Sequence, residues 1–191
     1  MNGAKSFGFC DLNISTEGDV RETAIQALKL GYKVIALNTE ISDEIIVTKR
    51  NKKGTYTEIP PPIKFTLTKE ELKKNGLIQE PKILSRITIK FSQPSSPFIH
   101  KSRDAILKYD LIAYKPLTEA AFKHLCQSNV DVDMISFDTS DSLYRPSRKL
   151  LNLAVKSDVY FELCYGPCLR SASCRLKTIQ LWHDMHRLFR C

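Results

Sequence analysis

The chain contains 191 residues, of which 42% are hydrophobic and 26% charged; this composition is typical of a globular domain with a sizeable core and not of a disordered chain. It has no run of 18 apolar residues, and its first twenty residues lack the order of a secretory signal peptide, so we expect neither membrane association nor secretion. The net charge of +8 favours an anionic partner, either nucleic acid or an acidic protein surface.

The first 38 residues predict a strand, a helix and a second strand. An apolar run over 7–14 is followed by apolar residues at helical spacing over 19–30 and by a short apolar run over 34–37. Gly31 stands where a left-handed C-terminal cap is expected. Two strands joined by one helix are parallel neighbours with a right-handed crossover, so this segment predicts an α/β fold.

Residues 41–82 contain many basic residues, a run of prolines and few apolar residues, and this composition predicts a long basic surface insertion. Eight basic and three acidic residues fall within 49–74, which places +5 of the net charge there. Pro60, Pro61 and Pro62 interrupt regular structure, and a short helix over 69–74 is expected to end at Gly76. A basic loop of this kind is either a solvated surface or a site of RNA contact.

The segment 83–91 predicts a strand with two different faces. One face carries Ile87, Ile89 and Phe91, and the other carries Arg86, Thr88 and Lys90. A parallel strand buried on both sides is normally apolar throughout. The polar face therefore points into a polar barrel interior, a groove or solvent, and the alternative is an edge strand with one solvated face.

The rest of the chain continues to alternate between helices and strands. A helix is expected within 95–109, with Leu107 facing inward. The following elements are a strand over 111–114, a helix over 118–126 capped by Thr118, a strand over 132–137, a helix over 146–154, a strand over 160–165 broken by Gly166-Pro167, and a helix over 171–189.

Together these elements give six strands with helices between them, which is the pattern of repeated βα units. A closed (β/α)8 barrel has eight units in about 250 residues. The prediction is one TIM-barrel-like domain over 1–191 that lacks about two of its eight units, interrupted by the insertion at 41–82.

In barrels of this class the active residues gather at the carboxyl ends of the strands. The polar residues there are Asp11, Asn13, Asn38, Glu40, Asp138, Asp141 and Glu162. No histidine is at a strand end, since His100 and His124 fall on predicted helices, and this argues against a zinc-type hydrolase. We therefore expect no catalytic residue, no metal ligand and no cofactor.

The histidines and cysteines raise two further questions, whether they form a zinc site and whether the cysteines form disulfides. A zinc site combining His183 and His186 with Cys168 and Cys174 is disfavoured, because the cysteine spacing exceeds that of ordinary structural sites. The six cysteines are scattered along the chain, which predicts reduced thiols and not a disulfide framework.

Basic residues recur at or near the expected βα connections. They are Arg86, Lys90, Lys115, Arg145, Arg148, Arg170 and Arg175. Because guanidinium groups bind phosphate oxygens in bidentate geometry, these residues predict a phosphate-binding rim for RNA. Ordinary scattered surface charge is the alternative interpretation.

Five segments in order carry a resemblance to a known family. They are Phe9-Cys-Asp-Leu-Asn13, the stretch 27–38, Ile83-Leu-Ser-Arg-Ile-Thr-Ile89, Tyr109-Asp-Leu-Ile-Ala-Tyr-Lys-Pro116 and Tyr160-Phe-Glu-Leu-Cys-Tyr-Gly-Pro167. Over about residues 7–180 the chain resembles the family of thirty-kilodalton protein subunits of ribonuclease P and ribonuclease MRP, which is shared with archaeal ribonuclease P.

The resemblance implies a TIM-barrel-like fold related to the polymerase-and-histidinol-phosphatase hydrolases. Those hydrolases carry a His-x-His metal pair at the first strand, where this chain has Asp11-Leu12-Asn13. The implied function is that of a non-catalytic scaffold in an RNA-based enzyme that processes precursor tRNA and rRNA. The implied partners are ribonuclease P RNA, MRP RNA, other protein subunits and, through the complex, precursor tRNA, with location in the nucleus and nucleolus.

Two other functions remain open at this point. One is a residual metal-dependent phosphoesterase using Asp11, Asp138 and Glu162, and the other is a subunit that binds only proteins. Members of the family continue past the sixth helix into two further βα units, so we expect a chain truncated at its C-terminus.

Overall fold

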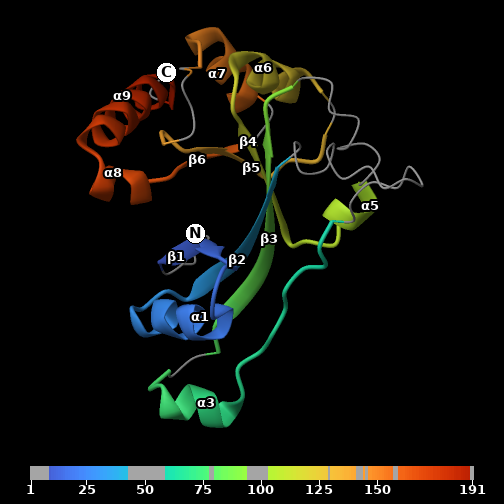
Figure 1. The fold of residues 1–191 in the computed structure, drawn as a ribbon, viewed down its shortest axis with the longest axis vertical. Helices are drawn as coiled ribbons and strands as arrows, with labels where there is room; N and C mark the ends of the chain where they lie inside the picture. The colour runs from blue at the N-terminus through green and yellow to red at the C-terminus, as the bar shows by residue number, and fades with distance from the viewer. Residues whose placement is uncertain are drawn as a thin grey trace, which may run out of the picture. The chain divides into compact units, whose positions relative to one another are not determined.

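The computed structural model describes residues 9–42, 59–77, 80–93, 103–128, 130–140, 144, 146–156 and 159–189. Its six strands form one sheet in the order β1-β2-β3-β4-β5-β6, with helices between them along the chain (Figure 1). The pairings β1·β2, β4·β5 and β5·β6 are parallel. The predicted fold class, an incomplete TIM-barrel-like βα repeat, is confirmed.

Contacts divide the chain into two compact units. Unit 1 comprises Met1–Glu40, Ile59–Ile87 and Asp104–Leu111, and unit 2 comprises Ile41–Glu58, Thr88–Arg103 and Ile112–Cys191. The organisation as one domain with an insertion at 41–82 stays a prediction, and residues 43–58 of that insertion lie outside the described part.

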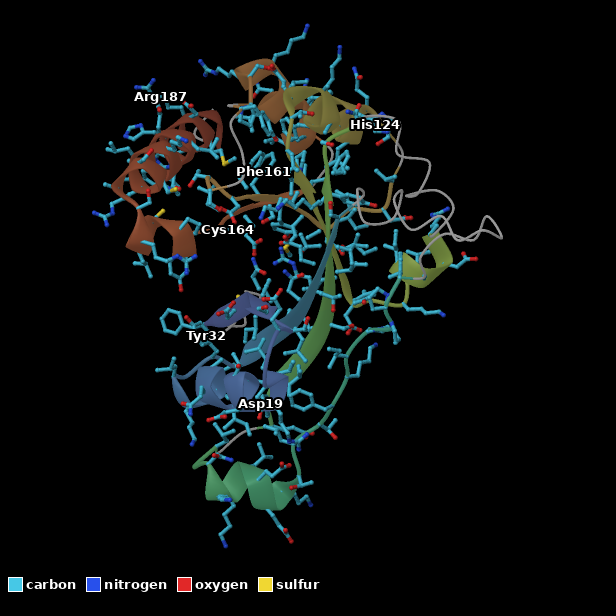
Figure 2. All side chains as sticks on the ribbon, in the orientation of Figure 1. Asp19, Tyr32, His124, Phe161, Cys164 and Arg187 are labelled. Atoms are coloured by element: carbon cyan, nitrogen blue, oxygen red, sulfur yellow. The ribbon has the colours of Figure 1, made fainter. Side chains whose placement is uncertain are left out.

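Unit 1 begins with the predicted strand, helix and strand. These are β1 (Cys10–Ser15), α1 (Val20–Lys29) and β2 (Val34–Ser42), which is longer than expected. The carboxylate of Asp19, labelled in Figure 2, accepts a hydrogen bond from the Glu22 N–H at 3.0 Å and so caps α1. Gly31 adopts a φ of 99°, which confirms the predicted left-handed residue after the helix.

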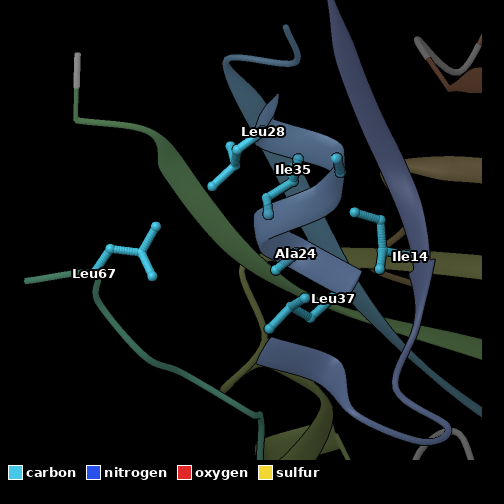
Figure 3. Packing of buried hydrophobic residues seen from close by; sticks show 7 residues of the cluster. Ile14, Ala24, Leu28, Ile35, Leu37 and Leu67 are labelled. Carbon is cyan, nitrogen blue, oxygen red and sulfur yellow. The ribbon is translucent and has the colours of Figure 1, made fainter. Parts of the chain in front are cut away.

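The core of unit 1 lies between α1 and the strands beside it. Its buried members are Ile14, Ala24, Ala27, Leu28, Ile35, Leu37 and Leu67 (Figure 3). Leu67 belongs to the predicted insertion, and so does Pro60, whose carbonyl accepts a hydrogen bond from the Tyr109 hydroxyl at 2.8 Å. The described part of the insertion therefore contributes to packing in unit 1.

Helix α3 (Lys69–Lys74) confirms the predicted short helix and starts at a capping box formed by Thr68 and Glu71. The Arg21 Nη2 lies 2.6 and 2.8 Å from the two carboxylate oxygens of Glu71, and the Arg21 guanidinium lies 5.0 Å from the ring centroid of Phe65. This ion pair joins α1 to α3, although α3 contains no buried residue. The hydrogen bonds from Arg21 and Thr68 lower the pKa of Glu71 to about 2.

Strand β3 (Lys82–Phe91) is buried on both of its faces. Ile87 and Ile89 are fully buried, and so are Arg86 and Thr88 on the opposite face. The strand lies between β2 and β4 in the sheet order. The edge-strand interpretation is therefore wrong, and the polar face points inward.

The remaining elements correspond to the predicted ones with shifted bounds, except for a short helix at 166–170 that was not predicted. They are α5 (Arg103–Ile106), β4 (Leu111–Pro116), α6 (Glu119–Gln127), β5 (Met134–Phe137), α7 (Arg148–Val155), β6 (Tyr160–Leu163), α8 (Gly166–Arg170) and α9 (Ala172–Phe189). The Thr118 hydroxyl accepts from the Ala121 N–H at 3.1 Å, which confirms the predicted cap of α6.

One local prediction is wrong and one helix was missed. Leu107 is 49% exposed and does not face inward, because the described helix ends at Ile106 and the chain turns there. The strand at 160 ends before Gly166-Pro167, as predicted, and this pair begins helix α8, which was not predicted. Proline suits the first turn of a helix because its fixed φ is helical and its missing N–H has no partner there to lose.

The core of unit 2 is built on aromatic and aliphatic side chains of β5, α6, α7 and α9. The rings of Phe122 and Phe137 meet edge to face at 5.6 Å, and Phe137 lies 5.9 Å from Phe161. Leu151 of α7 and Met185 of α9 are buried where these two helices pack. In the described ranges, no helix has the length and apolar character needed to cross a membrane.

We predict that Glu71→Gln reduces the acid dependence of stability. The folded-state pKa of Glu71 lies below its ordinary value of 4.5, so its ion pair stabilises the fold above that value and is lost as the pH falls toward about 2. In thermal unfolding between pH 6 and pH 2, the wild-type advantage over Glu71→Gln should shrink as the pH falls. Glu70→Gln, an exposed substitution in the same turn, is the matched control for the loss of one negative charge from α3.

Candidate nucleic-acid interface

Four polar side chains meet at the carboxyl ends of β4, β5 and β6 in unit 2. We call Lys115, Ser136, Asp138 and Cys164 the strand-end cluster. Lys115 Nζ lies 3.1 Å from Asp138 Oδ2, and these side chains are only 7% and 16% exposed. The Ser136 hydroxyl and the Cys164 thiol are 3.3 Å apart, and Figure 2 labels Cys164 next to the end of β6. The cluster is thus an internal polar network of unit 2.

The protonation states of the cluster follow from its contacts. Burial raises the pKa of Asp138, but hydrogen bonds from the Ser140 hydroxyl and N–H, together with the Lys115 charge, lower it more, so the net shift is downward. Burial raises the pKa of the Cys164 thiol, and the hydrogen bond to Ser136 opposes this only in part. The cluster therefore holds an ionised carboxylate paired with an ammonium group and a protonated thiol, which is a poor nucleophile.

The strand-end residues of unit 1 form a separate network. The Asp11 carboxylate accepts from the Asn13 N–H at 3.0 Å, and the Asn13 side-chain oxygen accepts from Asn38 Nδ2 at 2.6 Å. The fully buried Arg86 donates from Nη1 to the Leu12 carbonyl at 2.7 Å. The Asp11-Leu12-Asn13 segment is thus held by amide, backbone and guanidinium contacts within the unit.

No group of three or more histidine, cysteine, aspartate or glutamate residues in the described ranges has the arrangement of a metal site. Asp11 belongs to unit 1, whereas Asp138 and Glu162 belong to unit 2. Asp141 lies outside the described residues.

The cysteines and histidines of the disfavoured zinc site have other contacts. The ring of His186 stacks on Trp182 at 5.0 Å with an interplanar angle of 9°, and the Cys174 thiol lies 3.9 Å from the Thr139 carbonyl. His124 lies on α6, as predicted (Figure 2), and His100 is outside the described residues. None of the five described cysteines is in a disulfide.

The predicted basic rim divides into buried and exposed residues. Arg86 and Lys115 are buried, and Lys90 is half-buried. Arg148, Arg170 and Arg175 are exposed on α7, α8 and α9 of unit 2. Arg145 lies outside the described residues. The rim as a set of RNA contacts stays a prediction, and its exposed described members are on helices.

A cavity between α7 and α9 contains one of these arginines. Its volume is about 310 Å³, and it is lined by Pro146, Ser147, Arg148, Leu151, Asp184 and Arg187. Arg187 was not among the predicted residues. Its spacing of three from Asp184 places both on one helix face, but the sequence does not show that this face meets α7.

Comparison with known proteins identifies the family of this chain. A model of the family described as RNase P subunit p30 matches residues 8–191. The chain belongs to the RNase P subunit p30 family. This membership confirms the resemblance inferred from the five ordered segments.

Individual relatives agree with the family match. The mouse ribonuclease P protein subunit p30 is 30% identical over 176 residues, which are 90% of this chain and 62% of the mouse protein. The Arabidopsis thaliana protein GAMETOPHYTE DEFECTIVE 1 is 32% identical over 97 residues, which are 50% of this chain and 16% of that protein. The chain thus spans about three fifths of the length of its mouse relative.

A solved structure shares the fold of this RNase P subunit p30 family member. A chain in the cryo-EM structure of archaeal ribonuclease P with mature tRNA superposes with a TM-score of 0.61 and 18% sequence identity. The match covers 95% of this chain and 69% of the archaeal chain. At this identity the similarity establishes the fold.

We predict that Lys115→Met destabilises unit 2 by about 1–3 kcal/mol, because the Asp138 carboxylate, which is only 16% exposed, loses its charge partner and keeps only the hydrogen bonds from Ser140. The double variant Lys115→Met/Asp138→Asn should recover most of this loss. Urea denaturation of the four forms measures the coupling. Lys64→Met, which breaks the exposed 3.4 Å pair with Asp110, is the control and should cost less than about 1 kcal/mol. A double variant as unstable as the sum of its singles would contradict the pairing.

Proposed function

We propose that this protein is a non-catalytic, RNA-binding subunit of ribonuclease P that supports cleavage of precursor tRNA by an RNA catalyst. Membership of the RNase P subunit p30 family is the observation that carries the proposal. The archaeal structure with the same fold comes from ribonuclease P with mature tRNA. The finer assignments, a role in ribonuclease MRP and rRNA processing and location in the nucleus and nucleolus, extend the proposal from the mouse relative and the resemblance.

The contacts at the strand ends support a structural role for the residues that would otherwise carry hydrolysis. Asp138 is held by Lys115 and Ser140, and Asp11 accepts a hydrogen bond within its own strand. A metal-dependent hydrolase needs such carboxylates directed at a metal ion and a water molecule. Here they stabilise the ends of the sheet, which favours a scaffold over the residual phosphoesterase.

The charge distribution supports binding to RNA. The chain carries a net charge of +8, and the exposed arginines Arg148, Arg170 and Arg175 lie on three successive helices of unit 2. Exposed guanidinium groups bind phosphates without desolvating a buried partner. The proposed partners are therefore ribonuclease P RNA and the other protein subunits of the particle, with precursor tRNA bound through the complex.

We expect Arg170→Gln and Arg175→Gln each to weaken binding to ribonuclease P RNA and to reduce the slope of log K against log salt by about 1. The measurement is a filter-binding titration at several salt concentrations with the partner subunits present. Lys29→Gln, at an exposed position at the end of α1, is the control for a general loss of charge. Equal slopes for all three variants and the wild type would contradict the placement of RNA contacts on α8 and α9.

A second prediction separates the scaffold from the phosphoesterase. Asp11→Asn keeps the size of the side chain and an oxygen that accepts the hydrogen bond from the Asn13 N–H. Particles reconstituted with Asp11→Asn should therefore cleave precursor tRNA within about twofold of the wild-type rate, since loss of a catalytic group typically costs 10²-fold or more. Stoichiometric manganese or zinc in the purified chain, lost together with activity in Asp11→Asn, would instead establish the phosphoesterase.

A further inference from the structure

The cavity between α7 and α9 combines features that point to an anionic ligand. Arg148 comes from the first turn of α7 and Arg187 from the last turn of α9, so two guanidinium groups from different helices line one volume of about 310 Å³. Figure 2 labels Arg187 at the C-terminal end of α9, and this end lies beside α7 in Figure 1. Both helices belong to unit 2.

The charge of the lining favours an anion of limited size. Two arginines and one aspartate give the cavity wall a net charge of +1. Asp184 and Arg187 are three residues apart on α9, so the carboxylate can orient the guanidinium while leaving some of its five N–H groups to a ligand. The volume lies at the lower end of the range for small-ligand sites. The cavity therefore has room for a phosphate group together with part of the chain to which it is attached.

The remaining lining residues fit this ligand. Ser147 is exposed, and its hydroxyl makes no capping hydrogen bond to α7. Pro146 and Leu151 are buried and supply an apolar floor, which strengthens charge-assisted hydrogen bonds by keeping water from one side. The first turn of α7 contains no acidic residue that would oppose an anion there.

We infer that this cavity binds one backbone phosphate of an RNA, clamped between the guanidinium groups of Arg148 and Arg187. The inference rests on the proposed function and assigns it a specific contact. Two guanidinium groups on one phosphate act as a unit, because loss of either leaves the other without the geometry that makes the contact strong. The clamp thus differs from scattered surface arginines, whose effects are independent.

The test is a double-variant cycle on the full chain, with ribonuclease P RNA and the partner subunits present. Arg148→Gln and Arg187→Gln should each weaken binding about tenfold and reduce the salt slope by about 1. The double variant should be hardly weaker than either single, because both arginines hold the same phosphate. Lys149→Gln, exposed on the same helix and outside the cavity, and Lys177→Gln on α9 are the matched controls and should leave the slope nearly unchanged.

Four results would overturn the inference. Additive losses in the double variant, or equal losses in Arg148→Gln and Lys149→Gln, would show general electrostatic attraction. Inorganic phosphate can be titrated into the protein while the arginine side-chain N–H signals are followed by NMR. If phosphate shifts these signals but Arg148→Gln and Arg187→Gln bind RNA as tightly as the wild type, the cavity is a site for free phosphate and not for RNA. Failure of the wild-type assembly to bind RNA would overturn the proposed function as well, whereas the other three results leave it intact. Unchanged thermal unfolding of each variant excludes misfolding as the cause.

Discussion

The structure depends on one constraint: a charged side chain on the inner face of a parallel strand needs a partner within the protein. Both faces of a central parallel strand are buried, so such a charge loses its water. Removing an ion from water costs several kcal/mol unless hydrogen bonds or an opposite charge compensate. Arg86 on β3 and Lys115 on β4 are both buried. Each therefore needs a partner from another segment of the chain.

Each of these cations joins segments that are distant in the sequence. Arg86 donates to the Leu12 carbonyl and so ties β3 to β1 inside unit 1. Lys115 binds Asp138 and so ties the end of β4 to the end of β5 inside unit 2. In related barrel folds the strand ends hold the reactive groups. In this chain Asp138, at the end of β5, contacts Lys115 and Ser140 and so contributes to the stability of the sheet.

Features determined by neighbouring residues could be predicted from the sequence, and features determined by distant contacts could not. Thr118 and Gly31 mark helix ends through local backbone chemistry, and both predictions are confirmed. The alternating pattern of 83–91 identified a polar face on β3, but only the strand order shows that this face is buried. Likewise, the sequence predicted Arg148 near a βα connection. The position of Arg187 in the wall of the same cavity depends on the packing of α9 against α7, which the sequence does not show.

The described residues of the predicted basic rim therefore belong to two populations with different physical roles. Those on strands are buried or half-buried, and two of them, Arg86 and Lys115, hold the fold together. Those on helices, such as Arg148 and Arg170, are exposed and can exchange water for phosphate oxygens at little cost in desolvation. A loss of RNA binding on substitution of Arg86 would consequently report on the stability of unit 1, because an unpaired buried carbonyl and a cavity would remain in its place. Only the exposed population can report directly on contact with RNA, since its substitution leaves the packing of the sheet unchanged.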